Sequence, residues 1–454
     1  MDVRGKQKKS DERRSRINDL PDPLLCHILS YLSTKDSVRS SVLSNRWRRI
    51  WSQVPALDLN STQFDGDFDF VEFMDRFLGS DEKLDLKRLK LVCSFEDFEE
   101  FQSDDDSLFE SWIDDVVRRG IRHLHVEIMS DDNELLCMPL SLYSCRTLVN
   151  LTLYHVILGY LEPGSVVSLP CLKTMHLEMV RCDGSLILQM LIPSCPVLEK
   201  LSIIRDPYDL SDLTCVRSQS LKILTLEIKR FEDEVIDDHA VEIDAPGLEH
   251  MSLRDHLSKS FVLRIGPSAV VKVDVSFDME RGYLLDLDED HDDGSSERTV
   301  VGNFLTALSE VSGMDVSYAT LKVIDDYSKL EPLPQFSNLS WLHASFHGSS
   351  LEFLPTFLGC CPSLHSLVLE FDSFIEIKPS QLSYVPQCFA SSLKFVKLHT
   401  QFTRWTASRM TLATYFLEHC AVLKELVLDE SFGNIVRKVR NIPRKSVGCK
   451  IVIN

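Results

Sequence analysis

One six-residue pattern recurs along most of the chain and limits its possible folds more than any other feature. An apolar residue, most often leucine, stands at the first, fourth and sixth positions. The clear copies are LVNLTL, LKTMHL, LEKLSI, LKILTL and LEHMSL, which start at residues 148, 172, 198, 221 and 248, and LSWLHA, LHSLVL, LKFVKL and LKELVL, which start at 339, 364, 393 and 423. Alternating apolar positions predict a strand with one buried face. Spacings of 23 to 30 residues between neighbouring copies predict an array that grows along one axis, so a chain of 454 residues needs no single large core.

This pattern resembles the leucine-rich repeat, in which each unit supplies one strand to a curved parallel sheet and places a helix or irregular segment outside it. The resemblance implies an α/β fold with a solenoid over residues 59–379. Weaker copies, LKRLKL at 86, IRHLHV at 121, VVKVDV at 270 and VSGMDV at 311, extend the array. An acidic run near residues 284–298 interrupts it and predicts an exposed loop.

The residues before the array have the capping signals of three short helices. Asp22 and Pro23 suit a first helix, Ser33 or Thr34 a second, and Ser44 a third that carries Trp47 and Trp51 on one face. The order Leu-Pro, ILxxL, STKD and VLSNRWRRIW resembles the F-box over residues 17–58. The resemblance implies that this trihelical module docks on the Skp-type adaptor of a ubiquitin ligase and, through it, on the cullin.

About 40 residues are too few to bury a self-sufficient core, so some of their apolar side chains should meet a partner. We expect Trp47 to contact the adaptor and Trp51 to brace the module, with the arginines beside them mostly towards solvent or the partner. The expected docking residues are Leu20, Pro21, Leu24, Ile28, Leu29, Val38, Val42 and Trp47.

The last part of the chain, residues 380–454, resembles the FBD domain found behind leucine-rich repeats in plant F-box proteins. The resemblance lies in the order of three segments, VPQCFASSLKFVKLH, YFLEHCAVLKELVLD and IPRKSVGCKIVIN. They indicate a strand, a helix that ends at a cysteine, a second strand, and a basic turn before a final strand. We expect this region to cap the array, since an open sheet edge invites unwanted pairing.

Charge limits the partners of this chain. Its net charge is −20, and residues 1–16 carry seven basic and three acidic residues, or +4, so the remainder carries −24. An acidic body repels phosphate backbones, which argues against nucleic acid. We expect residues 1–16 to be a disordered basic tail. No apolar run is long enough to span a membrane or direct secretion, so we expect the nucleus or the cytoplasm.

No pattern points to catalysis or to a cofactor. Phosphate-binding loops, nucleophile elbows and zinc-binding helices are not evident in the sequence. An EF-hand frame from Asp288 fails because Asp293 and Thr299 stand where glycine and glutamate are needed. His123 and His125 lack an evident third metal ligand. Cys145, Cys195, Cys361 and Cys420 each stand three residues before a repeat, which indicates packing.

The F-box resemblance therefore implies the substrate-recognition subunit of an SCF-type ubiquitin ligase, a non-catalytic role in which the repeats bind an unknown target protein. Two alternatives stay open: a ligase-independent repeat scaffold or ligand-binding protein, and an enzyme with an unrecognised site. Exposed positions of the repeat strands should line the concave face and choose the target. The candidates are His125, Tyr154, His176, Glu178, Glu227, Arg254, His343, Glu370, Lys397 and His399.

Overall fold

The fold is described from a computed structural model of the chain. It describes residues 17–79, 86–94, 107–129, 135–162, 164–182, 186–206, 209, 213–228, 239–256, 258–276, 293–372, 379–400 and 406–453. The expected basic tail at 1–16 lies outside these residues. The chain divides into two compact units, Met1–Glu134 and Leu135–Asn454.

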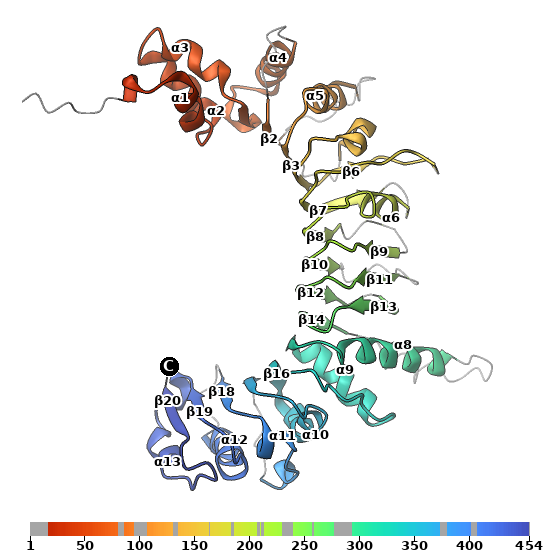
Figure 1. Cartoon of the computed structure of the whole chain (residues 1–454), viewed down its shortest axis with the longest axis vertical. Coiled ribbons are helices and arrows are strands. Elements are labelled where there is room, and N and C mark those ends of the chain that lie inside the picture. The colour runs from red at the N-terminus through yellow and green to blue at the C-terminus, as the bar shows by residue number, and fades with distance from the viewer. Residues whose placement is uncertain are drawn as a thin grey trace, which may run out of the picture. The chain divides into compact units, whose positions relative to one another are not determined.

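The first unit begins with the three expected helices, α1 (Asp22–Leu29), α2 (Thr34–Arg39) and α3 (Trp47–Ile50) (Figure 1). A short 3-10 turn, η2 (Ser40–Val42), follows α2. Ser33 caps α2, because its hydroxyl accepts a hydrogen bond from the Asp36 amide at 3.2 Å. The expectation for α1 was one residue late: Pro21 is the N-cap, and Asp22 already lies in the helix. The first turn has unpaired amides in any case, so a proline one position further in costs little.

Three parallel strands complete the first unit: β1 (Ala56–Asn60), β2 (Arg88–Ser94) and β3 (His123–Met129). The weaker sequence copies at 86 and 121 are therefore confirmed as strands. Helices α4 (Asp67–Leu78) and α5 (Ser107–Arg118) connect the strands. The two helices pack together, since the Trp112 indole donates to Asp75 at 2.8 Å and contacts the Phe70 ring edge-on.

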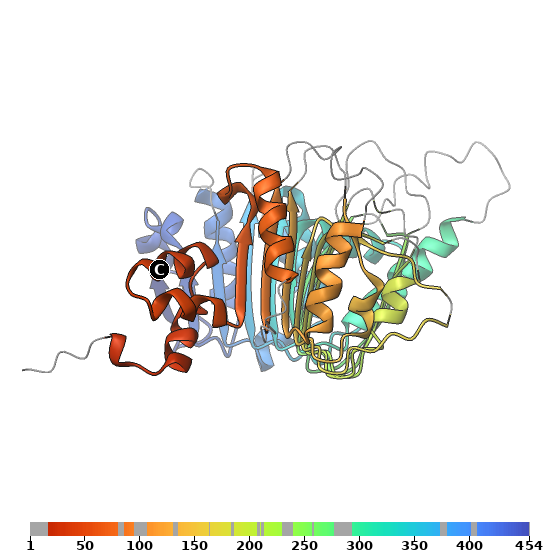
Figure 2. The same ribbon diagram turned by 90° about the horizontal axis from the view of Figure 1, so that it is seen from above.

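The second unit is dominated by a parallel sheet with one strand for each repeat. All nine clear copies of the pattern form strands, and so do the copies at 270 and 311. Seen along the stack, the strands lie behind one another (Figure 2). The strands in order are β5 (Asn150–Tyr154), β7 (Thr174–Cys182), β8 (Lys200–Arg205), β10 (Ile223–Ile228), β12 (His250–Asp255), β14 (Val270–Val275), β15 (Gly313–Val316), β16 (Trp341–His347), β17 (Ser366–Asp372), β18 (Phe395–His399), β19 (Glu425–Leu428) and β20 (Lys450–Ile453).

The outer side of the repeats, opposite the solvent face of the main sheet, is formed by strands in one part of this unit and mainly by helices in the rest. Behind β8 to β14 it is a second parallel sheet of β9 (Leu213–Arg217), β11 (Ala240–Ala245) and β13 (Ser260–Ile265). Strands β11 and β13 bury every second residue, which is the period of a strand and not of a helix. Elsewhere the outer elements are α6 (Ile187–Leu191), α9 (Tyr318–Ser328), α10 (Leu354–Gly359), α11 (Cys388–Ser391), α12 (Thr406–His419), α13 (Val436–Arg440) and the short strands β4 (Cys137–Met138) and β6 (Ile157–Leu158).

The prediction of a loop near 284–298 is wrong for residues 293–298, the part of this segment that the structure describes. Residues from Asp293 onward belong to helix α8 (Asp293–Leu308), whereas 284–292 lie outside the described residues. Val301, Phe304, Leu305 and Leu308 are buried along one side of α8. The Phe304 ring lies 5.2 Å from that of Phe261 in β13. The sequence at the start of α8 is charged, and its apolar residues begin only at Val300, so the charged start alone predicted a loop.

Strands β8, β10 and β12 bury alternate side chains towards the outer elements, whereas β20 at the end of the chain buries none. Leu224 and Leu226 in β10 and Leu253 in β12 are at most 1% exposed. A fully buried leucine stabilises a fold by about 1.5–3 kcal/mol, so regular burial across the repeats holds the array together. The four repeat-locked cysteines are buried too. Burial raises the pKa of Cys195 to about 12, which keeps its thiol protonated, as expected of a packing residue.

Candidate interaction surfaces

The helical module, residues 17–58, has a complete apolar core of its own. Leu25, Leu29, Trp47, Ile50 and Val54 form this core and are at most 5% exposed. The Trp47 indole nitrogen also donates to the Asn18 side chain at 2.6 Å. Leu29 and Trp47 stood in the expected docking set, but both are buried in this core. Trp51, which was expected to brace the module, is half-buried and packs against the same core.

Outside this core the module leaves several large apolar side chains in water. Three expected docking residues are among them, with exposed fractions of 50% for Leu24, 39% for Ile28 and 83% for Val42. Pro21 is exposed, whereas Leu20 and Val38 are half-buried. The expected docking set missed four further exposed residues, although helical spacing from Leu24 would have indicated Tyr31 and Leu32. We call the seven large side chains the exposed apolar set: Ile17, Leu24, Ile28, Tyr31, Leu32, Val42 and Leu43.

Arg46 fixes the segment that enters α1. Its guanidinium donates to Asp22 Oδ1 at 2.8 Å and to the carbonyl oxygens of Asn18 and Leu20 at 2.5 Å each. Arg48 and Arg49 are exposed, as expected, whereas Arg46 turns back to the start of the module and keeps 38% of its side chain in water. Several charge-assisted hydrogen bonds to one fork-shaped group hold the Leu-Pro start rigidly against α3.

The helical module is joined to strand β1 by more than the chain itself. The Asp58 amide in β1 donates to the Thr34 hydroxyl at 2.8 Å, and α2 packs beside β1. Arg88 in β2 donates to the Ser30 carbonyl oxygen. The outer edge of β1 would otherwise carry unpaired backbone amides, and α2 lies beside this edge. The module and strands β1 to β3 therefore form one body within the first unit.

The solvent face of the sheet in the second unit carries two rows of side chains, set by the strand register. Row A starts at Thr152 in β5, and row B starts two positions later at Tyr154. Row A continues with His176, Ser202, Thr225, Ser252, Lys272, Asp315, His343, Val368 and Lys397. Row B continues with Glu178, Ile204, Glu227, Arg254 and Asp274, and includes Ser345, Glu370 and His399 further along.

Nine of the ten expected target-binding residues lie in these two rows. The tenth, His125, holds the corresponding place in the first unit, where it pairs in register with Lys90. Lys397 lies between Val368 and Val427 on the neighbouring strands. The imidazoles of His125 and His176 lie 3.5 and 3.1 Å from the carboxylates of Glu127 and Glu178.

Imidazoles and carboxylates alternate across strands β15 to β19. His343 lies 3.0 Å from Asp315 and 3.6 Å from Glu370, and His399 lies 3.9 Å from Glu370 and 2.8 Å from Asp429. The hydrogen bond to Asp315 raises the pKa of His343 and lowers that of Asp315 itself. Asp315 and Asp429 were missed by sequence reasoning. The weak copy VSGMDV holds Asp315 at the exposed position, so its alignment with the stronger copies was the available signal.

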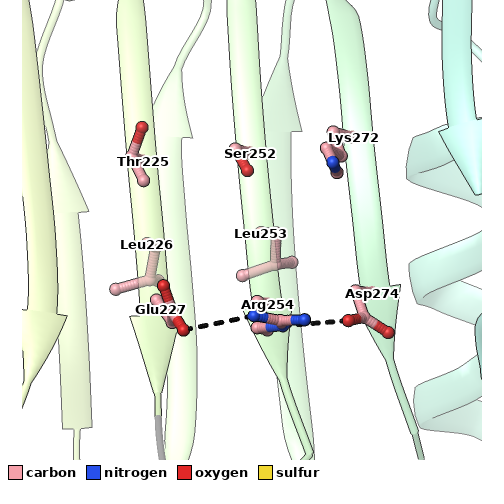
Figure 3. A pocket seen from close by; sticks show the side chains of 8 residues that line it. All are labelled: Thr225, Leu226, Glu227, Ser252, Leu253, Arg254, Lys272 and Asp274. Atoms are coloured by element: carbon pink, nitrogen blue, oxygen red, sulfur yellow. Dashed lines mark hydrogen bonds and ion pairs between the residues drawn. The ribbon is translucent and has the colours of Figure 1, made fainter. Parts of the chain in front are cut away.

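Strands β10, β12 and β14 carry a line of ion pairs in row B (Figure 3). Arg254 Nε donates to Asp274 Oδ2 at 3.0 Å, and Arg254 Nη1 donates to Glu227 Oε1 at 3.4 Å. These three residues and the row A residues Thr225, Ser252 and Lys272 line a depression of about 170 Å³. Carboxylates on both sides therefore hold the guanidinium in place above β12.

A second polar cluster is buried at the ends of strands β8 to β12. His239, 2% exposed, lies 2.6 Å from the Ser258 hydroxyl through Nδ1 and 3.1 Å from the Thr214 hydroxyl through Nε2. Arg205 donates to His239 and, at 3.2 Å, to Asp209. Burial and the nearby guanidinium lower the pKa of His239 to about 3. Its neutral imidazole thus links Thr214 in β9 to Ser258, which follows β12.

Among the residues that the structure describes, no group of three or more His, Cys, Asp or Glu side chains could hold a metal ion. Across the same ranges, none of the helices has the length and apolar character needed to cross a membrane.

Comparisons with known proteins match both units. Family models match for the F-box domain at residues 17–57, the LRR repeats of the FBD-associated F-box protein At5g56370 at 109–273, and FBD at 381–428. The F-box/FBD/LRR-repeat protein At1g80470 of Arabidopsis thaliana is 47% identical over 442 residues, covering 96% of this chain and 90% of the relative. The FBD-associated F-box protein At1g60410 of the same plant is 46% identical, covering 92% and 98%. The helical module, the repeat sheet and the C-terminal strands occur in the order of these three matches, and the chain belongs to the family of F-box/FBD/LRR-repeat proteins.

Proposed function

We propose that this protein is the substrate-recognition subunit of an SCF-type ubiquitin ligase. In this role the F-box binds a Skp-type adaptor, which connects it to the cullin, and the solvent face of the repeat sheet binds a target protein. The chain itself is an adaptor and catalyses no reaction. The observation that carries the proposal is the exposed apolar set, which remains in water although the F-box has a complete core.

Exposed apolar side chains of this size are a cost unless a partner covers them. Tyr31, Val42 and Leu43 are 72%, 83% and 62% exposed within a module of about 40 residues. Large contiguous apolar patches on soluble proteins commonly mark binding sites. Covering a fully exposed side chain of this kind contributes about 1.5–3 kcal/mol. Arg46 and Thr34 fix α1 and α2, so little conformational entropy is lost on docking.

The proposed mechanism is proximity. A target held on the sheet face has its lysines at a high effective concentration near the ubiquitin-charged enzyme of the ligase. The contacts of Thr34 with β1 and of Arg88 with Ser30 resist rotation of the F-box against the first strands. A rigid joint at this place would help to keep a bound target within reach. Rows A and B, with their mixture of charged, polar and apolar residues, supply the positions that choose the target.

Co-purification from plant cells tests the proposal. The wild-type chain should bring down a Skp-type adaptor and a cullin. A Leu24→Asp, Val42→Asp double variant should lose both, because it puts two charges where apolar contact is needed. Leu140→Asp is the matched control, since Leu140 is also an exposed leucine, at 59%, but lies in the second unit.

Leu29 and Trp47 are unsuitable for this test, because their replacement would disrupt the core of the module. If neither the adaptor nor the cullin accompanies the wild-type chain, the ligase role is wrong and a ligase-independent repeat scaffold takes its place. Undiminished recovery of both with the double variant would show that the exposed apolar set is not the docking surface.

A further inference from the structure

Two small hydroxyl residues, Thr225 and Ser252, line the depression over β10, β12 and β14. They lie in row A beside Lys272, in register across the three strands. Glu227, Arg254 and Asp274 form the adjacent line of row B (Figure 3). Larger side chains at either hydroxyl position would fill the space, so the depression depends on Thr225 and Ser252.

The cationic groups at this depression are well placed to donate hydrogen bonds outward. Lys272 is 66% exposed and its ammonium lies 3.9 Å from Asp315, at the far limit of an ion pair. Arg254 is 57% exposed, and its two ion pairs run sideways through Nε and Nη1. The hydroxyls of Thr225 and Ser252, on β10 and β12, add two more donors to this depression.

The acidic groups of the depression are less accessible than the basic ones. Glu227 and Asp274 are each 20% exposed, and both face the Arg254 guanidinium. A ligand entering from solvent therefore meets Lys272, Arg254 and the two hydroxyls first. Such a set of donors fits an anion.

The size and charge of the site select among anions. A phosphate group carries close to two negative charges at pH 7, and three carboxylates lie close by, on Glu227, Asp274 and Asp315. A carboxylate carries one negative charge and accepts two parallel hydrogen bonds. The three neighbouring carboxylates therefore repel it less than they repel a phosphate group. The depression of about 170 Å³ has room for one short side chain.

We infer that this depression receives the carboxylate of an aspartate or glutamate side chain from the target polypeptide, with Lys272, Arg254, Thr225 and Ser252 as donors. The inference deepens the proposed function and rests on it, because it names a feature of the target segment that the sheet face binds. It predicts that targets present an acidic residue to the middle of the repeat array.

Blocked alanine pentapeptides with one central residue varied provide the probe. Their binding to the full-length chain can be followed by saturation-transfer-difference NMR, which detects weak ligands of large proteins. The peptide with central glutamate should bind, and the peptide with glutamine should bind about tenfold more weakly, the effect of losing about one charge-assisted hydrogen bond. The phosphoserine peptide should bind more weakly than the glutamate peptide.

Two variants test the site in different ways. Lys272→Met removes a donor, and Ser252→Leu fills the depression without changing its charge. Each should weaken the glutamate peptide about tenfold. Lys222→Met is the matched control, since Lys222 is also an exposed lysine beside β10 but does not line the depression, and it should leave binding unchanged. Thermal unfolding of each variant verifies that it is folded.

Several results would overturn the inference: no binding of the glutamate peptide, equal binding of the glutamine peptide, tighter binding of the phosphoserine peptide, or no effect of either variant. Adaptor binding is measured on the same samples. If the adaptor binds but the peptide does not, the ligase role stands and the carboxylate site falls. If the peptide binds at the site but the adaptor does not, the site stands and the ligase role falls.

Discussion

The buried histidine His239 should make the repeat array sensitive to acid in a measurable way. Its pKa in the folded chain is about 3, because burial and the Arg205 guanidinium disfavour the imidazolium. In the unfolded chain the pKa returns to about 6.5. Below pH 6.5 the unfolded chain therefore binds a proton that the folded chain excludes. The free energy of unfolding must then fall with falling pH, by about 1.4 kcal/mol per pH unit until the folded-state pKa is reached.

Between pH 7 and pH 5 this one group lowers the free energy of unfolding by about 2 kcal/mol. A His239→Asn variant keeps a donor and an acceptor at the site but cannot titrate. It should be less stable than the wild type at pH 7, because the asparagine side chain is too short to meet both Thr214 and Ser258. The stability gap should then shrink by about 2 kcal/mol at pH 5.

Urea unfolding at the two pH values, followed by circular dichroism, measures this gap. His250→Asn is the control, since His250 lies on the solvent face of β12. NMR of ¹⁵N-labelled histidine provides a direct check, with the variant used to assign the His239 signals. A stability gap that does not change with pH, or a His239 ring that titrates near pH 6.5, would show that the buried imidazole is not the source of the acid sensitivity.

Three further predictions follow from other contacts. Leu25→Ala removes a fully buried leucine and should lower the free energy of unfolding by about 2–5 kcal/mol in urea titrations, and a loss under 1 kcal/mol would contradict the assigned core. Thr34→Val leaves a strand amide unpaired and should cost about 1–3 kcal/mol in the same assay without changing adaptor affinity; a weaker adaptor complex would mean that α2 contacts the adaptor there. Asp315→Asn should lower the raised pKa of His343, read by histidine NMR, and an unchanged pKa would remove Asp315 as its cause. Because that pKa is raised, protonated His343 stabilises the fold below about pH 6.5, and the contribution is lost as pH rises through the folded-state pKa.

Much of the fold was predictable because the repeat has a strong period. Every clear copy of the pattern is a strand, and the alternation of residues correctly assigned Glu227, Arg254 and Glu370 to the solvent face. The outer sheet of β9, β11 and β13 was not predicted, since leucine spacing describes only the inner strand of each repeat. Helix α8 was missed because its charged start obscured the apolar face around Phe304.

The sites were less predictable than the fold. Spacing placed Trp47 and Trp51 on one helix face, and both pack on the core of the module. The hydrogen bond from Trp47 to Asn18, 29 positions away, has no local sequence pattern. In the His239 cluster, hydrogen bonds join His239 to Arg205, 34 positions away, and to Ser258, 19 positions away, so no local sequence pattern predicts it. The depression at Ser252 exists because three strands align Thr225, Ser252 and Lys272 in one row, which only the register reveals.

Calorimetry of the purified full-length chain with a Skp-type adaptor measures whether the exposed apolar side chains of the F-box form the docking surface. Leu24, Val42 and Leu43 each leave half or more of the side chain in water. Docking that covers them gains about 1–1.5 kcal/mol from each. Replacing all three with serine should therefore weaken binding by at least about 100-fold, without loss of thermal stability. No measurable binding by the wild-type chain, or equal affinity of the triple variant, would contradict the account.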